Sequence, residues 1–300
     1  MIRFFVSPKD ISGGIIKLNE EDAAHIKALR LRPGEPFAVC DGEGTDYVCR
    51  LCGRSATVGG DTPAERSKTS TDGGKKHASG QASVGKSQTS EAEILETYPS
   101  RAEPSISCSV YIAYSQGDRL DYSVQKSVEL GTREIILFPA KRCEHIPGDI
   151  LKKTARLQKI ALEAAKQSGR GIVPSVTPVE SYEEAIGRAA HAELPLFLYE
   201  CEEKLHLKQA LTQYEGFSSG GERGDTANQQ RNRAVERNVF GDSISVVSIV
   251  IGPEGGFEPS EAETAKTAGM TTVTLGPRIL RCETAPAAAL AAIMYHTDNL

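Results

Sequence analysis

The sequence predicts an α/β protein whose larger, C-terminal part holds a mainly parallel sheet with helices on both faces, preceded by a small β-rich module. Three observations predict this. From residue 105 onward, short apolar runs typical of strands alternate with segments of helical periodicity. Two glycine loops, 252–256 and 276–281, each follow such a run and precede a helix. With 300 residues and 39% hydrophobic content, the chain can bury a sizeable core.

Residues 1–100 are expected to form the small module. Their strand-like runs are short and rich in β-branched and aromatic residues, and the turn Asp-Gly-Glu-Gly at 41–44 suits a hairpin. The predicted elements are a helix from 19 or 20 to 31 and strands at 3–6, 37–40, 46–52 and 91–97. Residues 99–104 are then expected to be the linker to the second domain.

The segment 53–90 differs in composition from the rest of the module. It consists mostly of small and polar residues, with two isolated valines and no leucine, isoleucine or aromatic residue. Such a segment cannot bury enough apolar area to offset its ordering entropy, so we expect a disordered insertion within a hairpin loop. A second polar insertion is expected at about 215–242.

The domain 104–300 is predicted from its alternating pattern. Pro259 at a first helical position, Glu261 in the first turn and Gly269 just past the end delimit one helix. The predicted strands are 106–112, 134–138, 195–200, 244–251 and 271–275. The predicted helices are 118–130, 148–168, 181–192, the one from 258, and an apolar one that begins at 283–286. This alternation favours a mainly parallel sheet.

Composition limits the classes of partner. A formal net charge of −5 argues against indiscriminate coating of nucleic acid, but residues 141–170 carry eight Lys or Arg against three acids. That excess suits either a local RNA-binding surface or an ordinary solvated helix face. No apolar run approaches a membrane span or a signal peptide, and the seven cysteines are scattered, so a cytoplasmic location is expected. Cys49 and Cys52 form a CxxC without a second ligand pair, so no metal site is predicted.

The two glycine loops indicate a ligand pocket lined by backbone. In an open parallel sheet, ligands bind beyond the carboxyl ends of the strands, where both loops are expected. The loop 252–256 is not the G-x-G-x-x-G of dinucleotide-binding folds, and no Gly-Lys-Ser/Thr follows its glycines. The sequence therefore gives little support to a site that cradles phosphate.

Several sequence blocks resemble a known family. IGPEGGF (251–257), LGPRILR (275–281) and ETA (283–285) resemble the signature of the SPOUT methyltransferases, and more narrowly the bacterial 16S rRNA (uridine N3) methyltransferases. QKSVELG (125–131) and QKIALEAAKQSGR (158–170) extend the resemblance. It covers nearly the whole chain apart from the two polar insertions, with the blocks in the expected order.

The resemblance implies a PUA-like RNA-binding β-barrel at 1–100 and a SPOUT domain with a deep trefoil knot at 104–300, assembled as a homodimer. It also implies S-adenosylmethionine as cofactor, with 16S rRNA or the small ribosomal subunit as partner. That cofactor carries no phosphate, so the glycines would let backbone groups approach adenine and ribose. The implied cofactor-binding residues are Leu198, Glu200, Ile251, Gly252, Pro253, Glu254, Gly255, Gly256, Leu275, Gly276, Ile279, Leu280 and Arg281.

Three positions depart from the family pattern. Cys282 lies where Thr is common, Lys166 where Glu is common, and Leu157 where Trp is common. None of these differences removes a loop glycine, so the expected cofactor site is unaffected.

Arg281 and Glu283 are the predicted catalytic residues. Methylation of uridine N3 requires an unpaired base that loses its N3 proton as it attacks. We expect Arg281 to stabilise the negative charge that develops on the uracil oxygens, and Glu283 to orient Arg281 or accept the proton. The competing interpretations are a surface charge for Arg281 and, for Glu283, an acid that only stabilises a helix N-terminus.

The predicted RNA-facing surface combines the basic stretch with the end of the N-terminal helix. Its residues are Arg30, Arg32, Arg142, Lys152, Lys153, Arg156, Lys159, Gln167 and Arg170. Two alternatives stay open at this point: a SPOUT enzyme that methylates ribose 2′-O, and an RNA-binding protein that has lost catalysis.

Overall fold

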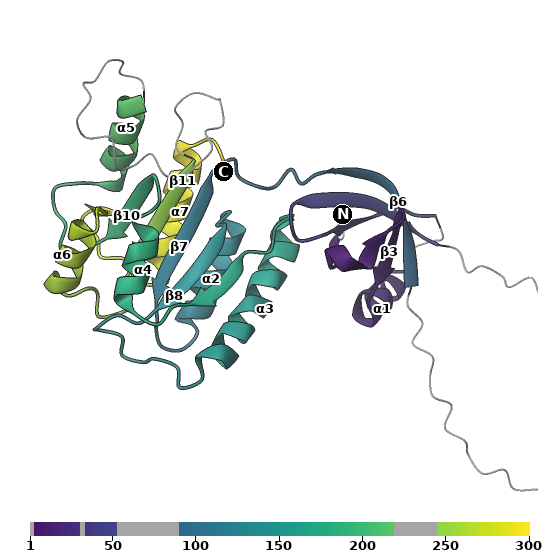
Figure 1. Cartoon of the computed structure of the whole chain (residues 1–300), viewed down its shortest axis with the longest axis horizontal. Coiled ribbons are helices and arrows are strands. Elements are labelled where there is room, and N and C mark those ends of the chain that lie inside the picture. The colour runs from purple at the N-terminus through teal and green to yellow at the C-terminus, as the bar shows by residue number, and fades with distance from the viewer. Residues whose placement is uncertain (1–2, 31–33, 53–89, 219–244) are drawn as a thin grey trace, which may run out of the picture. The chain divides into compact units, whose positions relative to one another are not determined.

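The computed structural model describes residues 3–30, 34–52, 90–218 and 245–300. The chain divides into two compact units: Met1–Asp41 with Thr45–Tyr98, and Gly42–Gly44 with Pro99–Leu300 (Figure 1). The two expected insertions lie outside the described residues, except that Ser90 begins a strand and 215–218 end a helix.

The first unit contains one six-stranded sheet in the order β1-β4-β5-β6-β3-β2. β1 runs parallel to β4, whereas β4 with β5, β3 with β6 and β2 with β3 are antiparallel. Its elements are β1 (Arg3–Phe5), a 3-10 turn (Pro8–Asp10), β2 (Ile11–Ser12), β3 (Ile15–Leu18), α1 (Glu20–Ala28), β4 (Phe37–Cys40), β5 (Thr45–Leu51) and β6 (Ser90–Pro99). A small core that includes Phe4, Ile16 and Phe37 holds the sheet against α1.

The second unit contains a six-stranded, entirely parallel sheet in the order β12-β10-β11-β7-β8-β9. The strands are β7 (Ser107–Ala113), β8 (Glu134–Phe138), β9 (Ser175–Pro178), β10 (Leu194–Leu198), β11 (Val246–Ile251) and β12 (Thr271–Val273). The helices are α2 (Arg119–Glu129), α3 (Ile150–Ser168), α4 (Tyr182–Ala189), α5 (Leu207–Ser218), α6 (Pro259–Thr267) and α7 (Thr284–His296). The predicted α/β class with a parallel sheet is confirmed.

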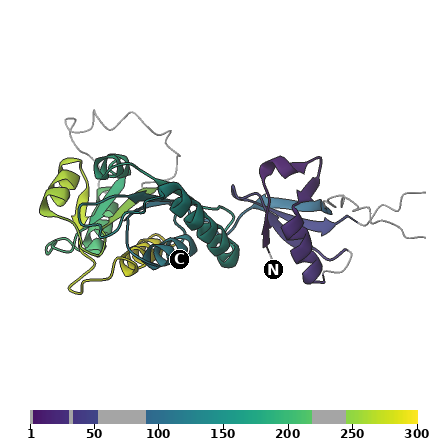
Figure 2. The same cartoon turned by 90° about the horizontal axis from the view of Figure 1, so that it is seen from below.

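Both faces of this sheet are covered, which explains why its strands are almost continuously apolar. On one face, Tyr111, Phe138 and Phe197 pack with residues of α4 and α6. The alternate positions of the strands face the side of α2, α3 and α7, and α7 packs against both β11 and α2 (Figures 1 and 2). The parallel arrangement places the carboxyl ends of β10, β11 and β12 together.

Local sequence signals set the boundaries of α3 and the start of α6. Asp149 accepts a hydrogen bond from the Lys152 N–H at 2.8 Å before α3, and Gly169 ends that helix in the left-handed conformation at φ 75°. Glu258 and Glu261 form a capping box at the start of α6, with Pro259 at its first position. The start of α6 lies where the sequence predicts it, and Gly169 directly follows the predicted helix 148–168, whereas the Asp149 cap was not predicted.

The short strand β9 and the helix α5 were not predicted. β9 has one deeply buried residue, Val176, and its backbone is held by the side chain of Gln158 on α3. Gln158 donates to the Pro174 carbonyl at 3.0 Å and accepts from the Val176 N–H at 2.8 Å. Such a strand depends on a contact that periodicity does not reveal.

Candidate cofactor cavity and catalytic cluster

A cavity of about 550 Å³ lies at the carboxyl ends of β10, β11 and β12. Its wall is formed by the loops that follow these strands, together with Arg119 at the start of α2. The structure brings into it every residue expected at the cofactor: Leu198, Glu200, Ile251, Gly252, Pro253, Glu254, Gly255, Gly256, Leu275, Gly276, Ile279, Leu280 and Arg281. Its volume lies within the usual range for small-molecule sites.

The glycine loop after β11 has no room for side chains. Gly256 has φ +67°, and a Cβ built there would lie 1.8 Å from Glu200 Oε1. That carboxylate oxygen accepts a hydrogen bond from the Phe257 N–H at 3.1 Å. A Cβ on Gly255 would approach the backbone oxygen of Arg142 to 3.1 Å. Close packing of Glu200 and Arg142 therefore requires glycine at these two positions, and the loop presents its backbone to the cavity there.

Glu254 in this loop is bound to the segment that begins α2. Its Oε1 accepts hydrogen bonds from the Gln116 N–H at 2.7 Å and from Arg119 Nη1 at 2.8 Å. Burial raises the pKa of Glu254, but these hydrogen bonds outweigh burial and hold the pKa below its ordinary value. The hydrogen bond to Glu254 in turn raises the pKa of Arg119. Both groups are therefore charged at neutral pH.

Sequence reasoning missed Arg119. It lies 135 residues from its partner Glu254, and nothing in its immediate surroundings distinguishes it from other surface cations. One signal was available, because Arg119 follows the carboxyl end of β7, which neighbours β11 in the sheet. Side chains at the same edge of a parallel sheet meet in one crevice.

The two predicted catalytic residues lie beside each other at the end of this cavity. Arg281 Nη1 is 3.9 Å from Glu283 Oε1, and Arg119 Nε is 4.0 Å from Glu283 Oε2. Glu283 occupies the N-cap position of α7, yet its side chain makes no capping hydrogen bond. The carboxylate instead lies between two guanidinium groups, so helix capping does not account for it.

Cys282 packs between these charges as a neutral thiol. Its Sγ donates to Glu283 Oε2 at 3.3 Å. Burial, reinforced by the hydrogen bond to Glu283, raises the pKa of Cys282 to about 12.

The predicted RNA-facing residues of the second unit fall into two groups. On α3, Lys152, Lys159 and Gln167 are exposed. Lys153 Nζ lies 3.2 Å from Asp121 Oδ1, and Arg156 forms an ion pair with the same carboxylate, so part of the basic charge is neutralised.

The other predicted positions are separate from α3. Arg142 is exposed and donates to the Gly255 carbonyl at 3.2 Å, at the rim of the cavity. Arg30 is exposed in the first unit, and Arg32 lies outside the described residues.

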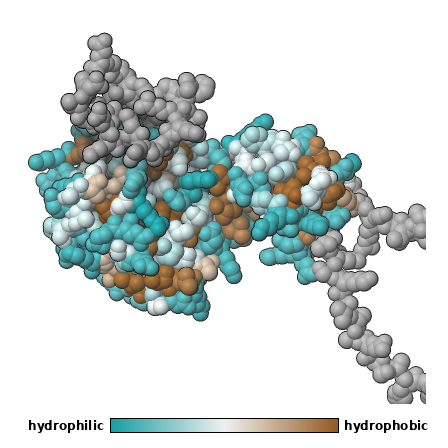
Figure 3. Space-filling view, in the orientation of Figure 1, coloured by the Kyte–Doolittle hydropathy of each residue, from teal (hydrophilic) through white to brown (hydrophobic). Residues whose placement is uncertain are grey.

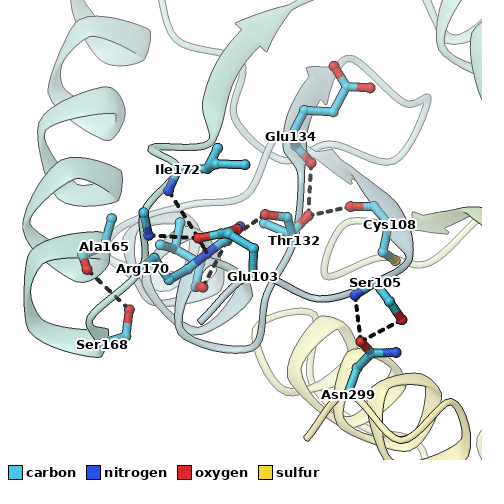
Figure 4. Close-up of polar contacts among 12 residues, drawn as sticks. Glu103, Ser105, Cys108, Thr132, Glu134, Ala165, Ser168, Arg170, Ile172 and Asn299 are labelled. Carbon is cyan, nitrogen blue, oxygen red and sulfur yellow. Dashed lines mark hydrogen bonds and ion pairs between the residues drawn. The ribbon is translucent and has the colours of Figure 1, made fainter. Parts of the chain in front are cut away.

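The prediction that Arg170 faces RNA is wrong. Its side chain is 3% exposed, and its guanidinium pairs with Glu103 through Nη2 and Oε2 at 2.6 Å (Figure 4). Nη1 also donates to the carbonyls of Val128 and Thr132, at 3.2 and 2.6 Å. Glu103 Oε1 accepts from the backbone N–H groups of Gly171 and Ile172. Arg170 therefore joins the ends of α2 and α3 to the segment before β7.

The remaining predictions concern metal and membrane. Cys49 is buried in the core of the first unit and Cys52 is exposed, so the CxxC thiols do not share an environment. The residues with defined coordinates contain no group of three or more His, Cys, Asp or Glu placed to hold a metal ion. Among the helices described, none combines the length and apolarity needed to cross a bilayer. The viewed surface is a mixture of hydrophilic residues and scattered apolar patches (Figure 3).

Comparison with known proteins gives consistent matches. Residues 102–294 match the family model of the RNA methyltransferase domain. The chain is 35% identical over 285 residues to ribosomal RNA small subunit methyltransferase E of Bacillus subtilis, covering 93% of this chain and 90% of that protein. It is 28% identical over 198 residues to the protein of the same name from Mesomycoplasma hyopneumoniae, covering 66% and 73%.

A solved structure covers the same length. The crystal structure of ribosomal RNA small subunit methyltransferase E from Neisseria gonorrhoeae, bound to S-adenosyl methionine, is 29% identical with a TM-score of 0.65. The match covers 98% of this chain and 97% of that one.

Proposed function

The chain belongs to the RNA methyltransferase family that includes ribosomal RNA small subunit methyltransferase E, and from this premise we propose that it methylates N3 of a specific uridine in 16S rRNA, with S-adenosylmethionine as methyl donor. The observation that carries the proposal is Glu283, held between Arg119 and Arg281 at the end of a cavity walled by glycine backbone. A carboxylate can accept the N3 proton there, and the two cations can stabilise the resulting anion.

The residues present fit the cofactor. Apolar side chains of Leu198, Ile251 and Leu275 and the backbone of 252–256 would hold the adenine and ribose, since all of them line the cavity and the glycines of that loop carry no side chain. When bound, S-adenosylmethionine supplies a methyl group on a positively charged sulfur, whose bond electrons stay with sulfur on transfer. The protein has to bring N3 within about 3–3.5 Å of that methyl carbon.

The chain's own residues manage the proton and the charge. Uracil N3 loses its proton to the Glu283 carboxylate, and its electron pair forms the new bond to carbon. Negative charge develops on the uracil oxygens beside N3 as the proton leaves ahead of bond formation, Arg281 stabilises it there, and the charge is lost as the new N–C bond is completed. The ring must be unpaired to reach these groups, because N3 lies on its base-pairing edge.

The same proposal assigns RNA binding to basic residues outside the cavity. On α3 these are Lys152, Lys153, Arg156 and Lys159 with Gln167, and Arg142 lies at the cavity rim. Arg30 and Arg32 would bind RNA from the first unit, which we infer to be a PUA-like barrel. Its six-stranded sheet with a small core is consistent with that architecture.

We also infer a trefoil knot and a homodimer. Support for the knot comes from chain path, because β12 lies at the sheet edge while the following loop leads to α7, which packs against β11 and α2. Support for the dimer is apolar surface near the C-terminus, where Tyr295 and Leu300 are 77% and 74% exposed.

Mass-spectrometric mapping of 16S rRNA tests the activity. Ribosomal RNA from cells with and without this protein is digested and compared, and purified protein with labelled cofactor should restore the missing modification. We expect one uridine to gain a methyl group on the base. A methyl group on ribose would favour a 2′-O-methyltransferase, and no change in any nucleotide would favour an inactive RNA-binding protein.

A further inference from the structure

A second cavity adjoins the first and shares three of its residues. It is open, has a volume of about 720 Å³, and lies at the N-terminal end of α2. Gly117, Tyr122 and Thr284 line it together with Arg119, Arg281 and Glu283, and the last three also line the first cavity. A molecule in the second cavity would therefore meet a ligand of the first at these three side chains.

Arg119 is the better fixed of the two shared cations. Its side chain is 40% exposed and is held by the hydrogen bond from Nη1 to Glu254, whereas Arg281 is 82% exposed and approaches Glu283 only at 3.9 Å. Among the described residues, the other guanidinium N–H groups of Arg119 donate no hydrogen bond. A donor that is already oriented stabilises developing charge better than one that must be ordered during the reaction.

The position of Arg119 is not explained by helix stability. It is the first residue of α2, where the helix dipole disfavours a cation. Glu254, which comes from the glycine loop of the first cavity, offsets this cost. The hydrogen bond between Arg119 and Glu254 therefore fixes the Arg119 guanidinium against the wall of the first cavity, where the two cavities adjoin.

Tyr122 offers the second cavity an aromatic surface. It lies three residues after Arg119 on α2, and its side chain is 47% exposed. Lys126 Nζ lies 5.7 Å from the ring centroid and so occupies one face. The other face is of the kind on which unpaired bases stack, an interaction worth about 1–3 kcal/mol per base.

We propose that the second cavity is the binding site of the unpaired pyrimidine, that Tyr122 stacks on it, and that Arg119 is a catalytic residue which binds a carbonyl oxygen beside N3. This inference rests on the proposed function. As N3 gives its proton to Glu283 ahead of bond formation, negative charge builds on that oxygen, and the charge is lost when the N3 electron pair completes the bond to the methyl carbon. Arg119 donates a hydrogen bond to it, and the electrons of the broken carbon–sulfur bond remain on sulfur.

The test compares two RNA substrates. 16S rRNA is transcribed with uridine or with 5-fluorouridine, free or reconstituted into small subunits, and single-turnover methylation is followed with wild-type protein and Arg119→Gln. Fluorine withdraws electrons and stabilises the N3 anion without the protein. We expect Arg119→Gln to be slower by about 100-fold on uridine RNA and by only about tenfold on 5-fluorouridine RNA.

Three further measurements test whether the effect on rate is specific to Arg119 and whether Tyr122 binds the RNA. Arg278→Gln, an equal charge loss in a loop residue that lines the first cavity but not the second, should keep the wild-type ratio between the two RNAs. Calorimetry should show a much smaller loss of cofactor affinity in Arg119→Gln than the about 100-fold loss of rate, and binding of the cofactor also shows that the variant folds. Tyr122→Ala should raise KM for RNA about tenfold at unchanged kcat, and Tyr122→Phe should restore it.

The outcomes separate the two proposals. If the wild type methylates a uridine N3 but Arg119→Gln is slowed equally on both RNAs, Arg119 does not stabilise the anion and this inference is overturned while the proposed function stands. Wild-type KM in Tyr122→Ala would reject the stacking site. If the wild-type product carries no methyl group on a base nitrogen, the proposed function fails, and this inference fails with it.

Discussion

Arg170 and Glu103 form a buried ion pair that joins the linker before β7 to the ends of two helices. Their Nη2 and Oε2 atoms lie 2.6 Å apart, and the Arg170 side chain is almost completely enclosed. The pair explains two of the blocks that resemble the family, because ELG at 129–131 ends α2 and SGR at 168–170 ends α3. The ends of these two blocks build a joint in the domain rather than an RNA contact, whereas Lys159 and Gln167 earlier in the second block are exposed.

Arg170→Ala should therefore destabilise the fold without acting on RNA directly. Removing one partner of a buried pair typically costs about 3–5 kcal/mol, and here the Val128 and Thr132 carbonyls also lose their donor. Urea denaturation measures the loss. Lys159→Ala, exposed on the same helix, is the matched control and should change stability by less than about 0.5 kcal/mol. Unchanged stability of Arg170→Ala would contradict this assignment.

Gly256→Ala should weaken cofactor binding. The position has a left-handed φ, and the new Cβ would collide with the Glu200 carboxylate that accepts from the Phe257 N–H. A conformational cost of about 1–2 kcal/mol corresponds to roughly a five- to thirtyfold loss of affinity, measurable by calorimetry.

Gly187→Ala on α4 is the control for this change, because no atom lies within 4 Å of its Cβ position. It should raise stability by up to about 1 kcal/mol and leave cofactor affinity unchanged. Equal affinities in the two variants would mean that the loop 252–256 does not form the cofactor wall.

Much of the large domain could be predicted from sequence, because buried parallel strands are apolar runs bounded by turns and caps. β8 begins and ends at its predicted residues, and the thirteen residues expected at the cofactor all line one cavity. Long-range pairing could not be predicted. The backbone of β9 is held by the side chain of Gln158, and Arg119 is positioned by Glu254. The charge of Arg170 gave no indication that this residue would be buried in an ion pair with Glu103.

Arg281→Ala should stop methyl transfer while leaving cofactor binding measurable. Arg281 lies mostly in solvent, so its loss costs little stability, but it removes a cation 3.9 Å from Glu283. We expect the single-turnover rate to fall by about 100-fold or more. Calorimetry with the cofactor and filter assays of transfer are run on the same preparation. A variant that transfers methyl groups at the wild-type rate would exclude Arg281 from catalysis.

Lys152 and Lys159 should contribute to RNA binding more than Lys153 and Arg156. Within the part of the chain that the structure describes, the first two form no salt bridge, whereas the second two share Asp121. Each phosphate contact removed should reduce the slope of log affinity against log salt by about 0.7. Charge reversal at both Lys152 and Lys159 is compared with reversal at Lys208, exposed on α5. Identical salt slopes in all three proteins would place the RNA surface elsewhere.

The link between Glu254 and Arg119 should fail in acid. The pKa of Glu254 is lower in the folded protein than in the unfolded chain. Ionised Glu254 therefore makes its full contribution to the free energy of unfolding above the unfolded pKa of about 4.3, and this contribution is lost as the pH falls through the folded pKa. Wild type should therefore exceed Glu254→Gln in free energy of unfolding by about 1–2 kcal/mol at pH 7. That difference should shrink below about pH 4 and vanish once the folded protein also binds the proton.

Urea denaturation at a series of pH values measures this difference in free energy of unfolding. Glu263→Gln, exposed on α6, is the control and should stay within about 0.5 kcal/mol of wild type throughout. A difference that grows as the solution becomes more acidic would mean that Glu254 is protonated in the folded state and does not hold Arg119 as an ion pair.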